Sequence, residues 1–178
     1  MKNLRVHPKI EPGHIDEIML IDQEAFGESS SPTAIRNAER NPWAYTVLSL
    51  NDHVLGYGLV LPIDRFAREA LVRGEISEDE VMARHVLLPD NCDAFYIASI
   101  ATRQNTLPVF RSRLVGYTLG SVLRAPKLTL AVAVSRDGDS IAREIGLEPR
   151  GLYVSQFKGI HEYNPTLFLR EAFNFNRN

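Results

Sequence analysis

The chain has 178 residues, of which 44% are hydrophobic and 24% charged, so we expect one domain with a sizeable buried core. Its formal net charge of −2 provides no electrostatic attraction to nucleic acid or to an anionic membrane. The apolar runs are too short to cross a bilayer, and Met1–Leu4 is not followed by the apolar region of a secretion signal. These features exclude neither an enzyme nor a binding module.

The single cysteine, Cys92, cannot form an internal disulfide, which fits a reducing compartment and a cytoplasmic location. Its neighbours Asn91 and Asp93 indicate a loop thiol rather than an activated nucleophile. The histidines are scattered without the spacing of metal ligands, so no metal site is expected. They are His7, His14, His53, His85 and His161.

The first elements are a short strand and two helices. Residues 4–10 predict a strand that Pro8 confines to the edge of a sheet. Residues 12–26 carry apolar side chains at the helical period. Ser31 followed by Pro32 is typical of a helix cap and first turn, and the helix is expected to run to about Glu39.

Residues 44–50 and 54–61 predict two strands joined by a tight hairpin turn at Asn51-Asp52. Gly56 and Gly58, inside the second of these strands, indicate a bulge or a close approach of another backbone.

Residues 63–91 predict a pair of charged helices, separated at Gly74, that forms an insertion between strands. Ser77 with Glu80 predicts a capping box at the start of the second helix. The charged positions are most simply solvated, although a segment in this position could also cover an acceptor pocket.

The second half alternates strands with helices, which predicts a mixed sheet with a parallel pair at its centre. In order, we expect a strand at 94–102, a helix at 108–123, a strand at 128–134, a helix capped by Asp137 or Asp139 and ending at Gly146, a strand at 151–157, a helix at 164–173 and a tail at 174–178. The strand at 94–102 opens directly into a helix, and such a junction presents free N–H groups to an anion.

With its elements in this order, the chain resembles the GNAT-type acyl-CoA N-acyltransferases over roughly residues 3–158, and several motifs carry the resemblance. The motifs are Ile21-Asp22-Gln23-Glu24-Ala25-Phe26, Ser31-Pro32, Asn51-Asp52-His53-Val54-Leu55-Gly56-Tyr57, Tyr96-Ile97-Ala98-Ser99-Ile100-Ala101 and Ile145-Gly146-Leu147. The resemblance implies a single α/β domain over residues 1–178, with a mixed, twisted sheet flanked by helices and a helical insertion after the third strand. It further implies transfer of an acyl group from acetyl-CoA or another acyl-CoA to an amine of a small molecule or a protein.

In this family the pantetheine arm of acyl-CoA lies between the fourth and fifth strands, and its pyrophosphate rests on the loop and helix start that follow. The positions of this chain that the resemblance assigns to acyl-CoA are Ile100, Ala101, Thr102, Arg103, Leu107, Pro108, Val109, Phe110, Arg111, Ser112 and Ser135. Ser135 stands where the family often has an asparagine.

The chain departs from the family pattern at the phosphate loop. Residues 107–112 contain no glycine, Pro108 lacks an N–H, and Phe110 is bulky where the backbone should approach a phosphate. Arg103, Arg111 and Arg113 could supply compensating charge, or they are simply solvated arginines at a helix start.

A second departure concerns proton transfer, because Ala142 occupies the position of the family's tyrosine acid. Candidate catalytic residues are instead Glu28, Tyr96, Ser99 and Tyr153, each with a structural alternative as a surface acid, core filler or packed aromatic residue. Both departures also favour an alternative function, that of a catalytically degenerate GNAT-like ligand-binding or protein-interaction module. The final helix could support a homodimer.

Overall fold

The computed structural model describes residues 3–27, 31–120, 122, 125, 127–152 and 165–171. In chain order the strands are β1 (Leu4–His7), β2 (Tyr45–Leu50), β3 (His53–Ile63), β4 (Ala94–Thr102), β5 (Leu128–Ala133), β6 (Glu148–Leu152) and β7 (Thr166–Arg170). The α-helices are α1 (Ile15–Phe26), α2 (Pro32–Arg40), α3 (Arg65–Arg73), α4 (Glu78–Arg84), α5 (Pro108–Gly120) and α6 (Arg136–Glu144). Short 3-10 turns are η1 (Pro12–His14), η2 (Pro42–Ala44) and η3 (Pro89–Asn91).

The strands form one mixed sheet of seven strands in the order β1-β2-β3-β4-β5-β7-β6. β4 and β5 run parallel, whereas β1–β2, β2–β3, β5–β7 and β6–β7 are antiparallel pairs. The prediction of a mixed sheet with a central parallel pair is therefore confirmed. The chain divides into two compact units: unit 1 comprises Met1–Val60 and Ser99–Ser121, and unit 2 comprises Leu61–Ala98 and Val122–Asn178.

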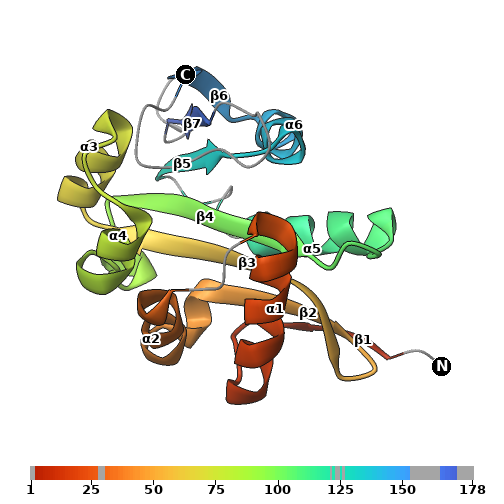
Figure 1. Ribbon diagram of the computed structural model, residues 1–178. Helices are drawn as coiled ribbons and strands as arrows, with labels where there is room; N and C mark the ends of the chain where they lie inside the picture. Colours follow the sequence, from red (N-terminus) through yellow and green to blue (C-terminus); the bar gives the residue numbers. More distant parts are fainter. Residues whose placement is uncertain are drawn as a thin grey trace. The chain divides into compact units, whose positions relative to one another are not determined.

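Unit 1 is organised around the hairpin of β2 and β3 (Figure 1). Asn51 and Asp52 form its turn with φ angles of 51° and 66°, the positive values that a two-residue hairpin turn needs. The predicted hairpin is confirmed. Its register shifts between Leu48 and Ser49, so one residue of β3 bulges from the ladder.

The two faces of β3 in unit 1 are covered by different helices. Tyr57 is hydrogen-bonded to Asp22 of α1, whereas a Cβ placed on Gly58 would collide with Thr118 of α5. Successive side chains of a strand point to opposite faces, so α1 and α5 pack on opposite sides of β3. At Gly58 it is a side chain that comes close, whereas a Cβ on Gly56 would lie 2.6 Å from the carbonyl oxygen of Ala101, so the predicted close approach of a backbone is confirmed at Gly56.

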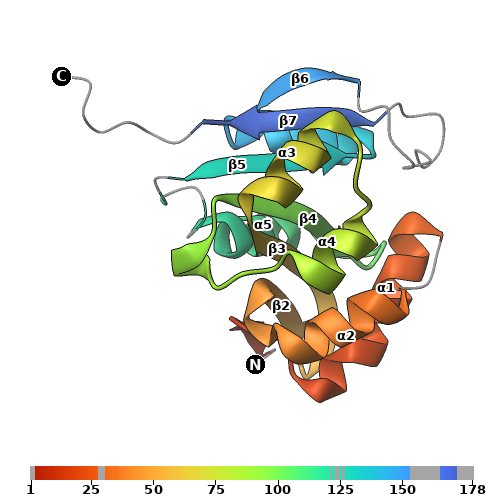
Figure 2. The same cartoon turned by 90° about the vertical axis from the view of Figure 1, so that its left-hand side faces the viewer.

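In unit 2, β7 lies between β5 and β6 and pairs with both (Figure 2). Phe168 at its centre is fully buried, and the guanidinium of Arg143 on α6 lies 5.4 Å from the centroid of its ring. Helix α6 is capped by Ser135, whose Oγ accepts a 3.1 Å hydrogen bond from Gly138 N–H. Neither Asp137 nor Asp139 is the N-cap, so that prediction is wrong.

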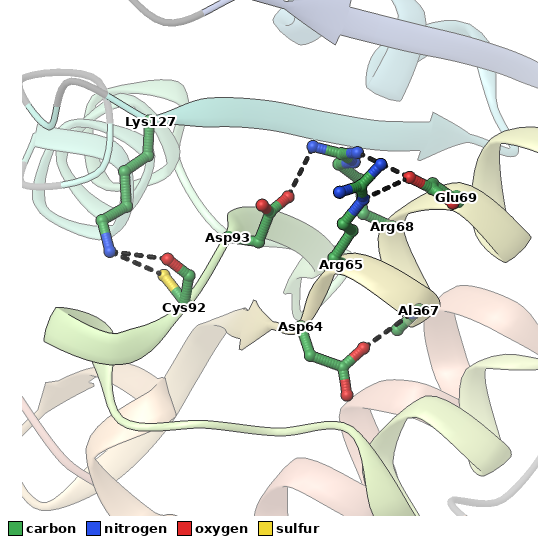
Figure 3. A network of polar contacts seen from close by, with 8 residues as sticks. All are labelled: Asp64, Arg65, Ala67, Arg68, Glu69, Cys92, Asp93 and Lys127. Atoms are coloured by element: carbon green, nitrogen blue, oxygen red, sulfur yellow. Dashed lines mark hydrogen bonds and ion pairs between the residues drawn. The ribbon is translucent and has the colours of Figure 1, made fainter.

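Helices α3 and α4 occupy the chain between β3 and β4, where the sequence predicts a helical pair. Asp64 caps α3 by accepting a 2.8 Å hydrogen bond from Ala67 N–H, and Ser77 caps α4 by accepting one of 3.2 Å from Glu80 N–H. Figure 3 shows two further contacts at the start of β4: Arg68 donates to Asp93 over 2.6 Å, and Lys127 donates to the carbonyl oxygen of Cys92 over 2.7 Å. These bonds attach α3 and the residue before β5 to the segment leading into β4.

The prediction of a helix over residues 164–173 is wrong, because Thr166–Arg170 form β7. Two neighbouring strands supply backbone partners for this segment, and Leu167 and Phe168 are buried between their neighbours. Tertiary pairing therefore overrides the local helix signal. The strand predicted at 151–157 begins earlier, as β6 (Glu148–Leu152), and residues 153–157 lie outside the described part of the chain.

Candidate functional site

The candidate site is formed by the end of β4 and the start of α5, within unit 1. The parallel pairing of β4 with β5 extends as far as Ile97↔Ala131, but β4 itself continues to Thr102. Residues 94–97 are buried, whereas residues 98–100 and Thr102 are only half-buried. The strand therefore becomes accessible just before the chain turns into α5.

Arg103 fixes the turn that follows β4. Its backbone N–H donates to the carbonyl oxygen of Leu55 and its Nε to that of Val54, each over 2.9 Å. Its Nη2 lies 3.0 Å from Glu17 Oε2, and its Nη1 lies 3.4 Å from Glu24 Oε1. The guanidinium thus binds the backbone of β3 and two carboxylates of α1, so its charge is already engaged inside the protein.

The start of α5 combines exposed apolar side chains with one half-buried arginine, Arg111. Leu107 and Val109 are 58% and 64% exposed, and Pro108 between them has no N–H to offer. Arg111 Nη2 donates a 3.0 Å hydrogen bond to the carbonyl oxygen of Gln104. Arg111 Nε is buried and has no hydrogen-bond partner among the described residues. An unsatisfied buried donor is costly, so this atom is an orphan that a ligand could satisfy.

A chain of hydrogen-bonded side chains lies beside the end of β4. The Tyr57 hydroxyl donates a hydrogen bond to Asp22 Oδ1, and the Tyr57 hydroxyl oxygen also lies 3.1 Å from Ser99 Oγ. These residues come from β3, α1 and β4, so three elements of unit 1 build the cluster. Tyr57 is buried, at 3% exposure, whereas Asp22 and Ser99 are half-buried. The cluster therefore extends from the interior towards the accessible part of β4.

Burial raises the pKa of the Tyr57 phenol well above its usual value, and the adjacent Asp22 carboxylate raises it further. The hydrogen bond with Ser99 acts weakly in the opposite direction. Tyr57 therefore stays protonated at neutral pH. It serves as a hydrogen-bond donor, not as a phenolate base.

Comparison with known proteins adds to this geometry. No protein-family model matches the chain, and no curated protein sequence matches it. Among solved structures, it is similar to the GphF GNAT-like decarboxylase in complex with isobutyryl-CoA, with a TM-score of 0.70 and 12% identity over 94% of this chain and 98% of that one. It is also similar to Arabidopsis thaliana Naa50 in complex with the bisubstrate analogue CoA-Ac-MVNAL, with a TM-score of 0.65 and 9% identity over 94% and 98% of the two chains. A GNAT-family acetyltransferase from Bacillus cereus gives a TM-score of 0.56 and 14% identity over 97% and 99%.

This chain has the GNAT fold. The expected fold class is confirmed, and with such low sequence identity it is the fold alone that the likeness establishes.

In this GNAT fold, the residues that the resemblance assigns to acyl-CoA separate into two groups. One group lies together in unit 1, along the end of β4, the turn and the first turns of α5. Its members are Ile100, Ala101, Thr102, Arg103, Leu107, Pro108, Val109, Phe110, Arg111 and Ser112. The second group is Ser135 alone, in unit 2, where its hydroxyl caps α6.

Of the four catalytic candidates, Tyr96 and Ser99 are described. Tyr96 is 1% exposed, and its hydroxyl donates a 3.0 Å hydrogen bond to Glu78 Oε2 on α4, so it is a core residue with a satisfied polar end. Ser99 is half-buried and belongs to the cluster with Tyr57. Glu28 and Tyr153 lie outside the described residues.

Sequence reasoning did not select Asp22 or Tyr57 as site residues, although both lie in the quoted motifs. A usable signal was present for Asp22, since it is an acid that directly follows the fully buried Ile21 in α1. Tyr57 lies between two glycines of a buried strand, and nothing in the spacing shows which helix its hydroxyl meets.

Cys92 behaves as a structural thiol. It is buried, and this burial raises its pKa, while the Lys127 ammonium 3.6 Å from Sγ partly opposes the shift. Across the described parts of the chain, no group of three or more His, Cys, Asp and Glu side chains is placed to hold a metal ion. In those same parts, every helix is too short or too polar to cross a membrane.

Proposed function

We propose that this protein is an acyl-CoA-dependent N-acyltransferase, resembling the acetyltransferases, that transfers an acyl group to an amine of a small molecule or a protein. The observation that carries the proposal is the buried Arg111 Nε at the start of α5, directly beyond the half-buried end of β4, for which the described residues supply no hydrogen-bond partner. A guanidinium at a helix N-terminus is well suited to a phosphate, because its N–H groups add to the positive end of the helix dipole.

Two of the structural neighbours support acyl-CoA as the ligand, since one is complexed with isobutyryl-CoA and the other with a CoA-containing bisubstrate analogue. The residues at the site fit such a ligand in part. Arg111 offers charge in place of the missing glycine loop, and the exposed Leu107 and Val109 offer an apolar surface that a ligand would cover. Pro108 has no backbone N–H and therefore cannot donate a hydrogen bond to a phosphate.

In the proposed reaction, the end of β4 positions the thioester, and its backbone N–H groups polarise the thioester carbonyl. The amine nitrogen attacks that carbon, the C–N bond forms, and the C–S bond breaks to release a thiolate. Ala142, which is buried, occupies the family's acid position and has no proton to give. Solvent therefore protonates the departing thiolate in this proposal.

The alternative is a GNAT-like module that binds a ligand or a protein without catalysing acyl transfer. It is favoured by the alanine at position 142 and by the absence of glycine from residues 107–112. The two candidates differ in turnover, not in fold.

Thermal unfolding with acetyl-CoA, isobutyryl-CoA, malonyl-CoA or free CoA tests the ligand. A ligand at about 100 times its dissociation constant should stabilise the protein by about 2.7 kcal/mol. Arg111→Ala should reduce the shift in melting temperature, whereas Arg113→Ala, a control at an exposed arginine of the same helix, should leave it unchanged. An unchanged melting temperature with all four compounds would contradict the proposal.

Release of the CoA thiol in the presence of a panel of amines then separates the two candidates. We expect release that depends on the amine. Binding without release on any amine would favour the non-catalytic module. Thiol release from malonyl-CoA without an amine would instead indicate hydrolysis. Conversion of malonyl-CoA to acetyl-CoA and CO₂ without thiol release would indicate decarboxylation, which is tested because one structural neighbour is a GNAT-like decarboxylase.

A further inference from the structure

In the polar cluster of Asp22, Tyr57 and Ser99, the chemistry of the side chains decides which group donates each hydrogen bond. An ionised carboxylate only accepts hydrogen bonds, so the Tyr57 hydroxyl donates its single proton to Asp22. The Tyr57 oxygen then has no proton left for Ser99, which lies 3.1 Å away. The Ser99 hydroxyl must therefore be the donor in that pair, and its own lone pairs remain available as acceptors.

The position of Ser99 places those lone pairs near the proposed reaction. Ser99 is half-buried and immediately precedes Ile100–Thr102, the segment of β4 that we propose positions the thioester. Tyr57 and Asp22 lie behind it, towards α1. A nitrogen attacking a thioester at this segment would come within reach of the Ser99 oxygen.

We propose that Ser99 accepts the proton of the attacking amine and that Tyr57 and Asp22 form the relay that carries the proton away. This inference rests on the proposed function. Ser99 is the catalytic residue of the set, because it alone would contact the substrate, whereas Tyr57 and Asp22 act through it.

The proton balance of the step is complete. As the nitrogen forms its bond to the carbonyl carbon, one nitrogen proton moves to Ser99 Oγ, the Ser99 proton moves to the Tyr57 oxygen, and the Tyr57 proton moves to the Asp22 carboxylate. The C–S bond then breaks with its electron pair on sulfur, and the thiolate takes a proton from solvent. Asp22 returns its proton to solvent, so an amine and an acyl-CoA give an amide and free CoA.

The surroundings of Tyr57 favour a relay over a phenolate base. Its titratable and charged neighbours are Asp22 on α1 and Tyr45 on β2, whose ring centroid lies 6.2 Å from that of Tyr57. Both neighbours disfavour the phenolate, so Tyr57 can pass a proton on but does not store the negative charge. The charge rests instead on Asp22, which is only half-buried.

The chain offers a matched control for this cluster. Tyr45 is another tyrosine at 3% exposure, on the adjacent strand, and its hydroxyl lies 3.5 Å from both Asn37 Nδ2 and the carbonyl oxygen of Ala34. Tyr45→Phe removes the same atom as Tyr57→Phe from a similarly buried place, but outside the cluster. A merely structural role for tyrosine hydroxyls predicts equal effects of the two variants.

The experiment measures steady-state acyl transfer from acetyl-CoA to the amine of the panel that gives the fastest turnover. We expect Ser99→Ala and Tyr57→Phe to lower kcat by about 100-fold or more, the usual size of a general-base effect, and Asp22→Asn to lower it comparably. Tyr45→Phe should keep wild-type kcat. The melting-temperature shift caused by acetyl-CoA should be the same in all of these proteins.

The dependence of the rate on the deuterium fraction in mixtures of H₂O and D₂O distinguishes a proton relay from a purely structural role of these residues. If several protons move together, the wild-type rate should depend on deuterium fraction along a curve. In Tyr57→Phe the dependence should become linear. If Tyr57→Phe fails to fold, Ser99→Ala, at a half-exposed position, provides the same comparison.

Several outcomes would overturn the relay: wild-type kcat in Ser99→Ala, equal losses in Tyr45→Phe and Tyr57→Phe, or a linear dependence in the wild type. Binding of acetyl-CoA without turnover on any amine also overturns the relay but leaves the acyl-CoA site intact. Failure of the wild type to bind any acyl-CoA overturns the proposed function, and the relay with it.

Discussion

Thr118 of α5 packs against Gly58 of β3 so closely that a Cβ on the glycine would collide with Thr118 Oγ1. This Oγ1 is itself buried and has no hydrogen-bond partner among the described side chains. Helix α5 and strand β3 therefore meet at a point with no room for a larger side chain at either position. The contact fixes α5, and with it the start of the candidate site, against the hairpin.

Gly58→Ala should accordingly destabilise the protein by about 1–3 kcal/mol, the usual cost of overpacking a core. The free energy of unfolding in urea measures the effect. Gly116→Ala in α5 is the control, because a Cβ at this position meets nothing within 4 Å. It should stabilise the protein by about 0.5–1 kcal/mol by removing a helical glycine. Equal effects of the two substitutions would contradict the packing described at Gly58.

Arg103→Lys should lower the free energy of unfolding by about 1–2 kcal/mol, because a lysine cannot bond Val54, Glu17 and Glu24 together. This expected loss of stability is smaller than for a fully buried charged network, because the Arg103 side chain is 30% exposed to solvent. Arg113→Lys, at an exposed position of α5 next to Tyr117, should change it by less than about 0.5 kcal/mol. A stability loss confined to Arg113→Lys would show that the Arg103 contacts contribute little.

Asp64 predicts a specific pH dependence. Burial alone would raise its pKa, but the hydrogen bond from Ala67 N–H and the contact with His85 outweigh burial and lower it. A carboxyl with a lowered pKa in the folded state stabilises the protein above its unfolded pKa, and this contribution is lost as pH falls through the folded value. Asp64→Asn keeps a helix-cap acceptor but removes the charge.

The difference in unfolding free energy between wild type and Asp64→Asn should be largest near pH 6 and should shrink below about pH 4. Urea titrations at several pH values from about pH 6 down to about pH 2 measure it. A difference that is constant over the whole range would show that the charge of Asp64 makes no contribution.

Cys92 should react slowly with a soluble thiol reagent in the folded state. Burial raises its pKa, and the thiolate is the reactive form, so we expect at least about tenfold slower modification at pH 8 than in urea. Because the chain has one cysteine, the absorbance of Ellman's reagent reports this site directly. Rapid, stoichiometric reaction of the folded protein would instead indicate an accessible thiol.

Local signals in the sequence predicted most of the elements correctly. Asn51-Asp52 predicted the hairpin, Ser31 and Ser77 predicted helix caps, and all three are present. Each of these signals acts between residues two or three positions apart, where chain geometry alone decides the contact. The continuous apolar run at 128–134 likewise predicted a strand, observed as β5.

Signals that depend on distant partners failed or were ambiguous. Thr166–Arg170 is a strand because β5 and β6 pair with it, and no local pattern in the segment reveals those partners. The hydroxyl of Ser135, a position that the resemblance assigns to acyl-CoA, caps α6. Arg103, for which the sequence allowed either a phosphate contact or a solvated position, is bonded to Glu17 and Glu24, two partners that no local pattern indicated.

The sequence by itself determined the α/β character, the order of nearly all elements and the strand that opens into α5, because hydrophobic period and capping residues act locally. Only the tertiary structure decided what surrounds that junction. It placed Asp22, Tyr57 and Ser99, which are 35 and 42 residues apart along the chain, in one hydrogen-bonded cluster. It also left Arg111 Nε buried with no hydrogen-bond partner in the described part of the chain. Such contacts depend on which faces of β3, β4 and α1 meet, and this is set by packing over the whole unit rather than by any local pattern.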